Sequence, residues 1–207
     1  MLITLCASHI TSMDDIIRIR EMIASHDNQT LKTKLYISIS YENDLLKYIH
    51  ELASDNTILY IRHTPATQFM HYKLLVNDLL PIYKNIHVLF TDDDDILHPH
   101  RNAIYAEYLR HNIIKIDSIK ILYDEFGFNK EHITTGKPDE YVNLCIRLNI
   151  VSEILNNKPD NELNKWLCDV DFNMHIAHYY KIYKPPYPIG LYYYRKHFMK
   201  RCRHINP

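Results

Sequence analysis

Short apolar runs alternate with longer amphipathic segments through the first half of the chain. Four runs of large apolar residues are typical of buried strands, at residues 2–7, 35–40, 57–62 and 86–90. Apolar positions at helical spacing follow the first three runs, at residues 13–23, 44–53 and 67–80. Strands and helices that alternate every 20 to 30 residues or so predict βα units on a mainly parallel sheet flanked by helices. The expected fold class is therefore α/β.

The second half of the chain has a less regular pattern. It predicts a short helix at residues 104–109, a strand at 119–123 and a helix from about residue 139 that ends before Pro159. The last helix is expected to bury five apolar positions, Tyr141, Leu144, Cys145, Leu148 and Leu155. Residues 124–140 contain two glycines and little periodicity, which indicates a hairpin or a mobile loop that covers a site.

Four consecutive aspartates, Asp92 to Asp95, follow the fourth predicted strand. Adjacent carboxylates repel one another, and a hard divalent cation with oxygen ligands relieves this repulsion. In an extended chain Asp92 and Asp94 point the same way about 7 Å apart, Asp93 faces away and Asp95 begins a turn. Open α/β sheets bind ligands at the carboxyl ends of their strands. The run therefore predicts a cation and ligand site rather than a solvated loop.

Other polar residues are expected at the same edge of the sheet. In a doubly wound sheet the loops after the first, second and fourth strands gather together. This places Ser8, His9, Ser40 and Tyr41 around one crevice with the aspartates. Ser8, His9 and Ser40 are accordingly candidate substrate-binding residues.

Length and charge limit the classes of protein to which the chain can belong. At 207 residues, with 46% hydrophobic and 24% charged side chains, it is long enough for one globular domain with a sizeable core. A formal net charge of -1 offers no general attraction to nucleic acid. The basic segment at residues 195–203 is better suited to the phosphates of a small ligand.

Cysteine spacing and apolar run lengths bear on the compartment. Cys6, Cys145, Cys168 and Cys202 show no CxxC spacing, so neither a zinc site nor a disulfide framework is expected. The amino terminus lacks the basic region of a signal peptide, and no run approaches the ~18 apolar residues of a membrane helix. A cytoplasmic protein with no membrane span is expected.

The segment FTDDDDILHP at residues 90–99 resembles the D-x-D-D signature of GT-A fold glycosyltransferases, especially the inverting family 2 enzymes. The resemblance implies a single Rossmann-like GT-A domain over residues 1–207. Residues 1–100 are then the nucleotide-sugar-binding half and residues 101–207 the acceptor and catalytic half. Asp94 is the expected ligand of Mn²⁺ or Mg²⁺, Asp92 holds the ribose or a metal-bound water, and Asp93 is a further candidate for substrate binding.

A second segment, WLCDVDFNMH at residues 166–175, resembles the acidic pair that opens a helix in family 2. The resemblance gives Asp169 the role of general base, although Cys168 stands where the family usually has Glu. Asp171 is a rival for that role. Two alternatives remain open, that these aspartates only cap a helix, or that Asp171, His175 and His178 form a metal-binding stripe.

A third segment, PIGLYYYRKH at residues 188–197, resembles the closing Tyr-Arg-x-His strand of the family. It implies that His197 contacts the metal and the diphosphate, and that Arg195 or Lys196 neutralises phosphate oxygens. Lys73, on the third predicted helix, matches loosely a basic residue placed against the nucleotide.

Taken together, the resemblance implies transfer of a sugar from a UDP or GDP type nucleotide-diphospho sugar to a hydroxyl of a glycan or glycoprotein. The resemblance extends to the small capsid-modifying glycosyltransferases of large algal DNA viruses. Two alternatives are a non-catalytic glycan-binding GT-A domain and a haloacid dehalogenase-like phosphohydrolase, which would use Asp92 and Asp94. The latter family places its motif on the first strand, whereas three βα units precede it here.

Overall fold

The computed structural model describes residues 1–42, 44–116, 118–123, 132–135, 141–164, 168–185 and 191–196. At residues 118–123, 132–135, 168–169 and 192–196 only the backbone is described.

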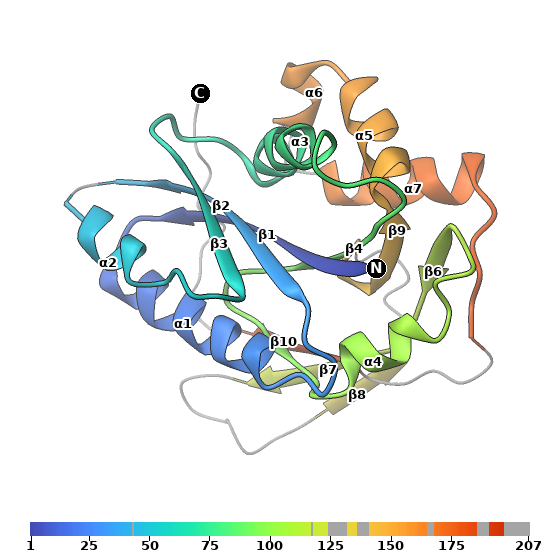
Figure 1. Cartoon of the computed structure of the whole chain (residues 1–207), viewed down its shortest axis with the longest axis horizontal. Helices are drawn as coiled ribbons and strands as arrows, with labels where there is room; N and C mark the ends of the chain where they lie inside the picture. The colour runs from blue at the N-terminus through green and yellow to red at the C-terminus, as the bar shows by residue number, and fades with distance from the viewer. Residues whose placement is uncertain are drawn as a thin grey trace.

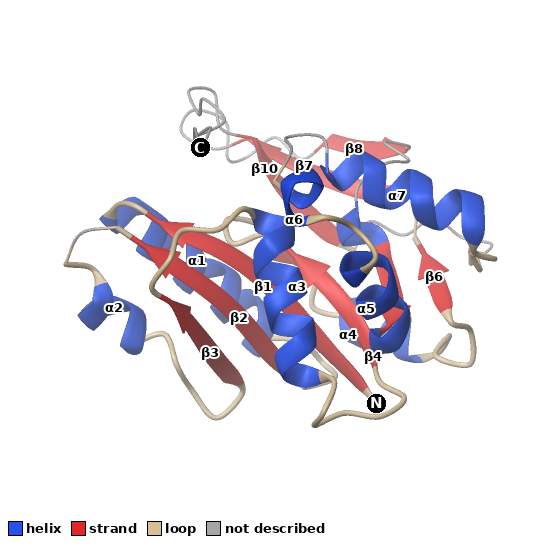
Figure 2. Cartoon of the chain, turned by 90° about the horizontal axis from the view of Figure 1, so that it is seen from above, coloured by secondary structure: helices blue, strands red, loops and turns tan. Residues whose placement is uncertain are grey.

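A six-stranded sheet forms the centre of the fold (Figures 1 and 2). In order across the sheet its strands are β3 (Thr57–Arg62), β2 (Lys34–Tyr41), β1 (Leu2–Ile10), β4 (His87–Thr91), β9 (Leu144–Arg147) and β6 (Ile113–Lys115). The first four of these are parallel, as the sequence predicts. β9 runs antiparallel to β4, and β6 runs antiparallel to β9, so the sheet is mixed.

Helices cover both faces of this sheet (Figure 2). α1 (Met13–Asp27) and α2 (Leu46–His50) pack on one face, and α3 (Gln68–Leu79) and α5 (Leu148–Asn156) pack on the other. β2 shows how the sequence builds both cores, because Ile37 and Ile39 pack with α1 while Tyr36 packs with α3. The predicted layers are confirmed.

A capping box begins α1. Ser12 is the N-cap, and its hydroxyl accepts a hydrogen bond from Asp15 N at 3.4 Å. The Asp15 carboxylate in return accepts from Thr11 N at 3.0 Å and from both neighbouring hydroxyls. These bonds begin the helix two residues after β1 ends, so α1 crosses directly to β2.

The prediction of a helix from about residue 139 is wrong for residues 141–147. Residues Tyr141–Asn143 form a short 3₁₀ turn, η1, and Leu144–Arg147 form the inserted strand β9; only Leu148–Asn156 are α-helical. A short apolar run fits a buried strand as well as a helix. Pairing with β4 on one side and β6 on the other, which local spacing does not encode, favours the strand.

A second, smaller sheet lies beside the first (Figure 1). Its strands in order are β5 (Ile96–Leu97), β10 (Tyr192–Lys196), β7 (Ser118–Tyr123) and β8 (His132–Thr135). β7, which matches the strand predicted at residues 119–123, pairs antiparallel with β8. The rest of the predicted hairpin or loop, residues 124–131 and 136–140, lies outside the described residues. The short helices α4 (Arg101–Ala106) and α6 (Asp160–Leu163) and the longer α7 (Cys168–Tyr179) complete the fold.

Through the described ranges, the helices are too short or too polar to traverse a lipid bilayer.

Candidate functional site

The aspartate run lies where the order of the central sheet reverses. β1 lies between β2 and β4, and the crossovers on its two sides use opposite faces of the sheet. Such a switch point leaves a ligand-binding position outside the carboxyl ends of the strands. Ser8 and His9 at the end of β1, and Asp92 directly after β4, belong to this edge.

The backbone turns earlier in the run than the sequence predicts. β4 ends at Thr91, and Asp93 and Asp94 are already in a turn, whereas an extended chain up to Asp94 was expected. The alternation rule that placed Asp92 and Asp94 on one side therefore does not apply. Adjacent aspartates instead reach different elements of the fold.

Asp92 is held by two side chains from distant parts of the sequence. Its Oδ1 accepts a hydrogen bond from Gln68 Nε2 at 2.7 Å and another from the Tyr141 hydroxyl. Gln68 Nε2 also lies 2.7 Å from the Tyr141 hydroxyl, and the Tyr72 hydroxyl donates to Thr91 O at 3.1 Å. Three elements, α3, η1 and β4, thus fix the orientation of this carboxylate. Sequence reasoning did not identify Gln68, and it placed Tyr141 in the core without predicting its contact with Asp92.

Asp93 joins β4 to β1. The Ser8 hydroxyl donates a hydrogen bond to Asp93 Oδ2, across 85 positions of sequence. The structure therefore brings Ser8 to the aspartate run, as expected. Asp95, at the end of the run, is 1% exposed and belongs to the interior.

His9 lies beside Ser40 at the ends of β1 and β2. His9 Nδ1 is 2.8 Å from Ser40 Oγ, and His9 Nε2 is 3.3 Å from Glu42 Oε1. The parallel register pairs His9 with Ser40, which is why the two predicted residues meet. Glu42 was not predicted, because it follows the strand without a recognisable motif.

The aspartates create a strongly negative potential at this edge. Cys6 lies in β1 opposite Thr91, the residue before the aspartate run, and is fully buried. Burial and then the charges of Asp93, Asp92, Asp94 and Asp95 raise the pKa of its thiol well above the usual value. A thiol that stays protonated is a poor metal ligand, so the site offers hard oxygen donors. Cys6 and Cys145 are both free and buried.

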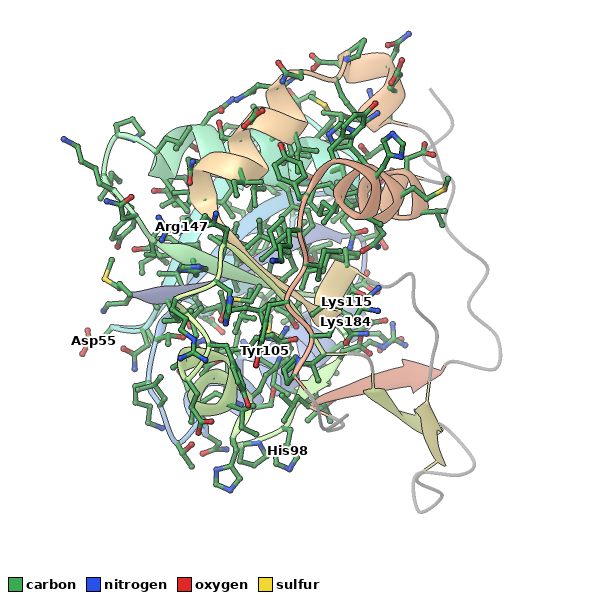
Figure 3. All side chains as sticks on the ribbon, turned by 90° about the vertical axis from the view of Figure 1, so that its right-hand side faces the viewer. Asp55, His98, Tyr105, Lys115, Arg147 and Lys184 are labelled. Atoms are coloured by element: carbon green, nitrogen blue, oxygen red, sulfur yellow. The ribbon has the colours of Figure 1, made fainter. Side chains whose placement is uncertain are left out.

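A buried arginine supports the strand that carries the aspartates. Arg101 of α4 is 1% exposed, and its Nη2 donates to Phe90 O and to Val142 O, each at 2.8 Å. Its guanidinium lies 5.7 Å from the ring centre of Tyr105, which is labelled in Figure 3. The Tyr105 hydroxyl donates to Asn143 O at 2.7 Å. Arg101 and Tyr105 therefore attach η1 to the end of β4.

Lys73 is not brought to the aspartates. Its ammonium group donates to Asp160 Oδ1 at 2.8 Å and to Lys158 O at 3.3 Å. These contacts attach α3 to the start of α6. The nucleotide contact expected of Lys73 stays a prediction.

The second acidic segment begins α7, close to the end of β4. Phe172 is 2% exposed, and its ring centre lies 5.3 Å from that of Phe69 and 5.9 Å from that of Phe90. Phe90 is two residues before Asp92, so this packing brings the first turns of α7 toward the aspartate run. Asp171 is exposed on α7, and the side chain of Asp169 lies outside the described residues.

The third segment also approaches the aspartates. β10 pairs antiparallel with β5, with Tyr193 opposite Ile96. Because β5 directly follows the aspartate run, the backbone after Tyr193 runs back toward that run. Arg195 lies on this part of β10, with its side chain outside the described residues. His197 lies outside them altogether.

The metal-binding stripe on α7 is not supported. Asp171, His175 and His178 do not form a group able to hold an ion, and the described part of the chain contains no other such group of three His, Cys, Asp or Glu residues. The His175 ring instead packs on Tyr179, with 4.6 Å between ring centres. Spacing on one helical face therefore does not by itself indicate a metal site.

No protein-family model matches the chain, and no curated protein matches it. Solved structures do match. S. aureus TarS in complex with UDP-GlcNAc is similar with a TM-score of 0.59 and 16% identity, over 96% of this chain and 60% of that chain. 4-Diphosphocytidyl-2C-methyl-D-erythritol synthase is similar with a TM-score of 0.52 and 9% identity, over 90% of this chain and 92% of that one. A Mycobacterium tuberculosis protein in complex with manganese has a TM-score of 0.50 and 7% identity, over 94% and 89% of the two chains.

These similarities establish the fold. The chain is a single α/β domain of the GT-A-like type, with a mixed central sheet flanked by helices, as the sequence predicted. It spans 60% of the TarS chain in that complex and 37% of a longer TarS chain.

Proposed function

We propose that the chain is a metal-dependent glycosyltransferase that moves a sugar from a nucleotide-diphospho sugar to a hydroxyl group of a glycan or glycoprotein. The observation that carries the proposal is the place of the aspartate run, directly after β4 at the switch point between β1 and β4, where Ser8 of β1 bonds Asp93 and Gln68 of α3 bonds Asp92. The likeness to a protein that holds UDP-GlcNAc supports a UDP-sugar donor. A GDP-sugar is the alternative donor.

The donor atoms at the site suit Mn²⁺ or Mg²⁺. Both ions prefer oxygen ligands, and the aspartate run supplies carboxylates beside a thiol that remains protonated. Asp94 and His197 are the residues proposed to hold the ion. A bound ion would offset the charge that develops on the departing diphosphate. The manganese complex of a protein with a similar fold agrees with this choice.

The donor is proposed to lie across the carboxyl ends of β1, β2 and β4. Asp92, whose Oδ1 is held by Gln68 and Tyr141, is proposed to hold the ribose or a metal-bound water. Asp93 and Ser8 would shape the floor of the site, and His9 and Ser40 its side. Arg195 is proposed to bind phosphate oxygens as a charge-assisted donor.

The acceptor hydroxyl must lose its proton as it attacks the anomeric carbon. Asp169 is the proposed base, and Asp171 is its rival on the same helix. Attack from the side opposite the leaving diphosphate inverts the configuration of the sugar. A phosphohydrolase has less support, because that mechanism expects its aspartates after the first strand and β4 carries them here.

A panel of nucleotide sugars in a thermal-shift assay tests this proposal. A ligand at 100 times its Kd stabilises the native state by about 2.7 kcal/mol, which is worth about 5 to 10 °C for a domain of this size. We expect a UDP-sugar with manganese to give this shift, and the same sugar with EDTA to give less than about 2 °C. Free UMP and ATP are the controls. A panel in which no nucleotide sugar raises the melting temperature would contradict the proposed function.

A further inference from the structure

A continuous chain of hydrogen-bonded side chains crosses from α3 to the carboxyl ends of β1 and β2. Both ring nitrogens of His71 on α3 are engaged, Nδ1 with Ser38 Oγ and Nε2 with Ser40 Oγ, each at 2.9 Å. Beyond Ser38 the chain continues to Arg62 Nε at 3.2 Å. Beyond Ser40 it continues to His9 Nδ1 at 2.8 Å. The chain thus joins an interior histidine to a residue of the proposed donor site.

One end of this chain is a hydrogen-bond acceptor. His9 Nε2 faces Glu42 Oε1 at 3.3 Å, and a carboxylate can only accept. A neutral His9 ring therefore carries its proton on Nε2 and accepts at Nδ1, so the single hydroxyl proton of Ser40 points to His9. Ser40 must then accept from the other side, which requires the proton of His71 to be on Nε2.

The other end of this series of hydrogen bonds is a hydrogen-bond donor, and it requires the same direction of donation. Arg62 Nε–H can only donate, so Ser38 accepts from it and has its own proton left for His71 Nδ1. Asp78 fixes the Arg62 guanidinium through a bond from Nη2. Every group between Arg62 and His9 therefore donates once and accepts once, and both ends require the same tautomer of His71.

Burial makes this arrangement rigid. His71 is 1% exposed, and Ser38 and Ser40 are fully buried. Burial first, and then the positive charge of Arg62, lower the pKa of His71 to about 4. At neutral pH the ring is therefore uncharged, with one donor and one acceptor. Buried groups that lose a partner incur the full cost of desolvation, so neither serine can turn away.

We propose that His71 is a positioning residue that, through Ser40, fixes the ring orientation and the tautomer of His9, so that His9 Nε2–H is directed to Glu42 at the edge of the donor site. The part of this inference that concerns the donor rests on the proposed function. The tautomers themselves do not, and they can be measured without any ligand.

Nitrogen-resolved NMR of the unsubstituted protein tests the direction in which these hydrogen bonds are donated. At pH ~9, well above the ordinary histidine pKa of about 6.5, we expect His71 and His9 each to show a protonated Nε2 and an unprotonated Nδ1. A proton on Nδ1 of His71 would overturn the inference.

A double-mutant cycle tests whether His71 acts through Ser40. His71→Phe and Ser40→Ala should each move the His9 Nδ1 resonance, and the double variant should move it no further than either, because residues in one network are not additive. An unmoved His9 resonance in His71→Phe, or additive shifts, would overturn the inference. If His71→Phe does not fold, Ser40→Ala and the measurement on the unsubstituted chain still decide the question.

Donor kinetics give the functional readout. His71→Phe should raise the KM for the donor about tenfold, the worth of one buried hydrogen bond, and change kcat by less than about twofold. His87→Phe is the matched control, because it removes a buried bond to His111 O at the opposite end of β4. An unchanged KM in an active His71→Phe enzyme would contradict the positioning role alone. A chain that binds no nucleotide sugar would contradict the proposed function and leave the NMR result standing.

Discussion

Asp94→Asn should lower sugar transfer by about 100-fold or more while the protein remains folded. An amide has the shape of the carboxylate without its charge, so a metal ligand is lost at little cost in packing. Loss of the charge stabilisation that a metal ion provides is worth several kcal/mol in the transition state. Repulsion within the aspartate run also falls, so the melting temperature should change by no more than a few degrees. Steady-state transfer with a saturating donor, beside thermal melting, measures both effects.

Asp44→Asn is a suitable control for this variant. Asp44 is an exposed aspartate in the loop between β2 and α2, and it is not among the residues proposed to bind the metal or the donor. It should keep the activity of the unsubstituted chain. Near-normal transfer by Asp94→Asn, in a preparation whose Asp44→Asn control is also normal, would remove Asp94 from the mechanism.

Asp169→Asn should separate catalysis from donor binding. If Asp169 is the base, the substitution keeps the affinity for the donor and lowers transfer by about 100-fold or more, the usual scale for general-base catalysis. A residue that only caps α7 would behave differently, because Asn caps a helix about as well as Asp. Calorimetric donor affinity, transfer rate and melting temperature should be measured together for each variant.

Asp171→Asn is the matched variant on the same helix. Asp171 is exposed, so its substitution should leave stability and transfer within about twofold of the original if Asp169 is the base. A normal rate in Asp169→Asn with a collapse in Asp171→Asn would transfer the role to Asp171. Normal rates in both variants would remove this segment from the mechanism.

The first half of the fold could be predicted because its signals are local. Each βα unit combines an apolar run with a helix of regular spacing, and the N-cap bonds of Ser12 and Asp15 start α1 where the pattern indicates. The switch point follows from the order of the units, which is why Ser8 meets the aspartate run as expected. The contact is with Asp93, which the extended-chain rule had facing away.

The remainder depends on contacts between residues that are distant in the sequence. β9 is a strand because β4 and β6 both pair with it, although its apolar run also fits a helix. The bond between Tyr141 and Asp92 spans 49 positions, and that from Gln68 spans 24. The His71 chain likewise joins strands and a helix whose spacing shows no motif. Lys73 likewise bonds Asp160, which lies 87 positions away and which helical spacing does not indicate.

Titration calorimetry of UDP with the full chain tests the central claim most directly, because the account requires the aspartate run to bind a diphosphate together with a divalent ion. We predict binding in millimolar manganese that weakens at least tenfold in excess EDTA, and that loses its manganese dependence in Asp94→Asn. Equal affinity for UDP with manganese and with EDTA would contradict the account.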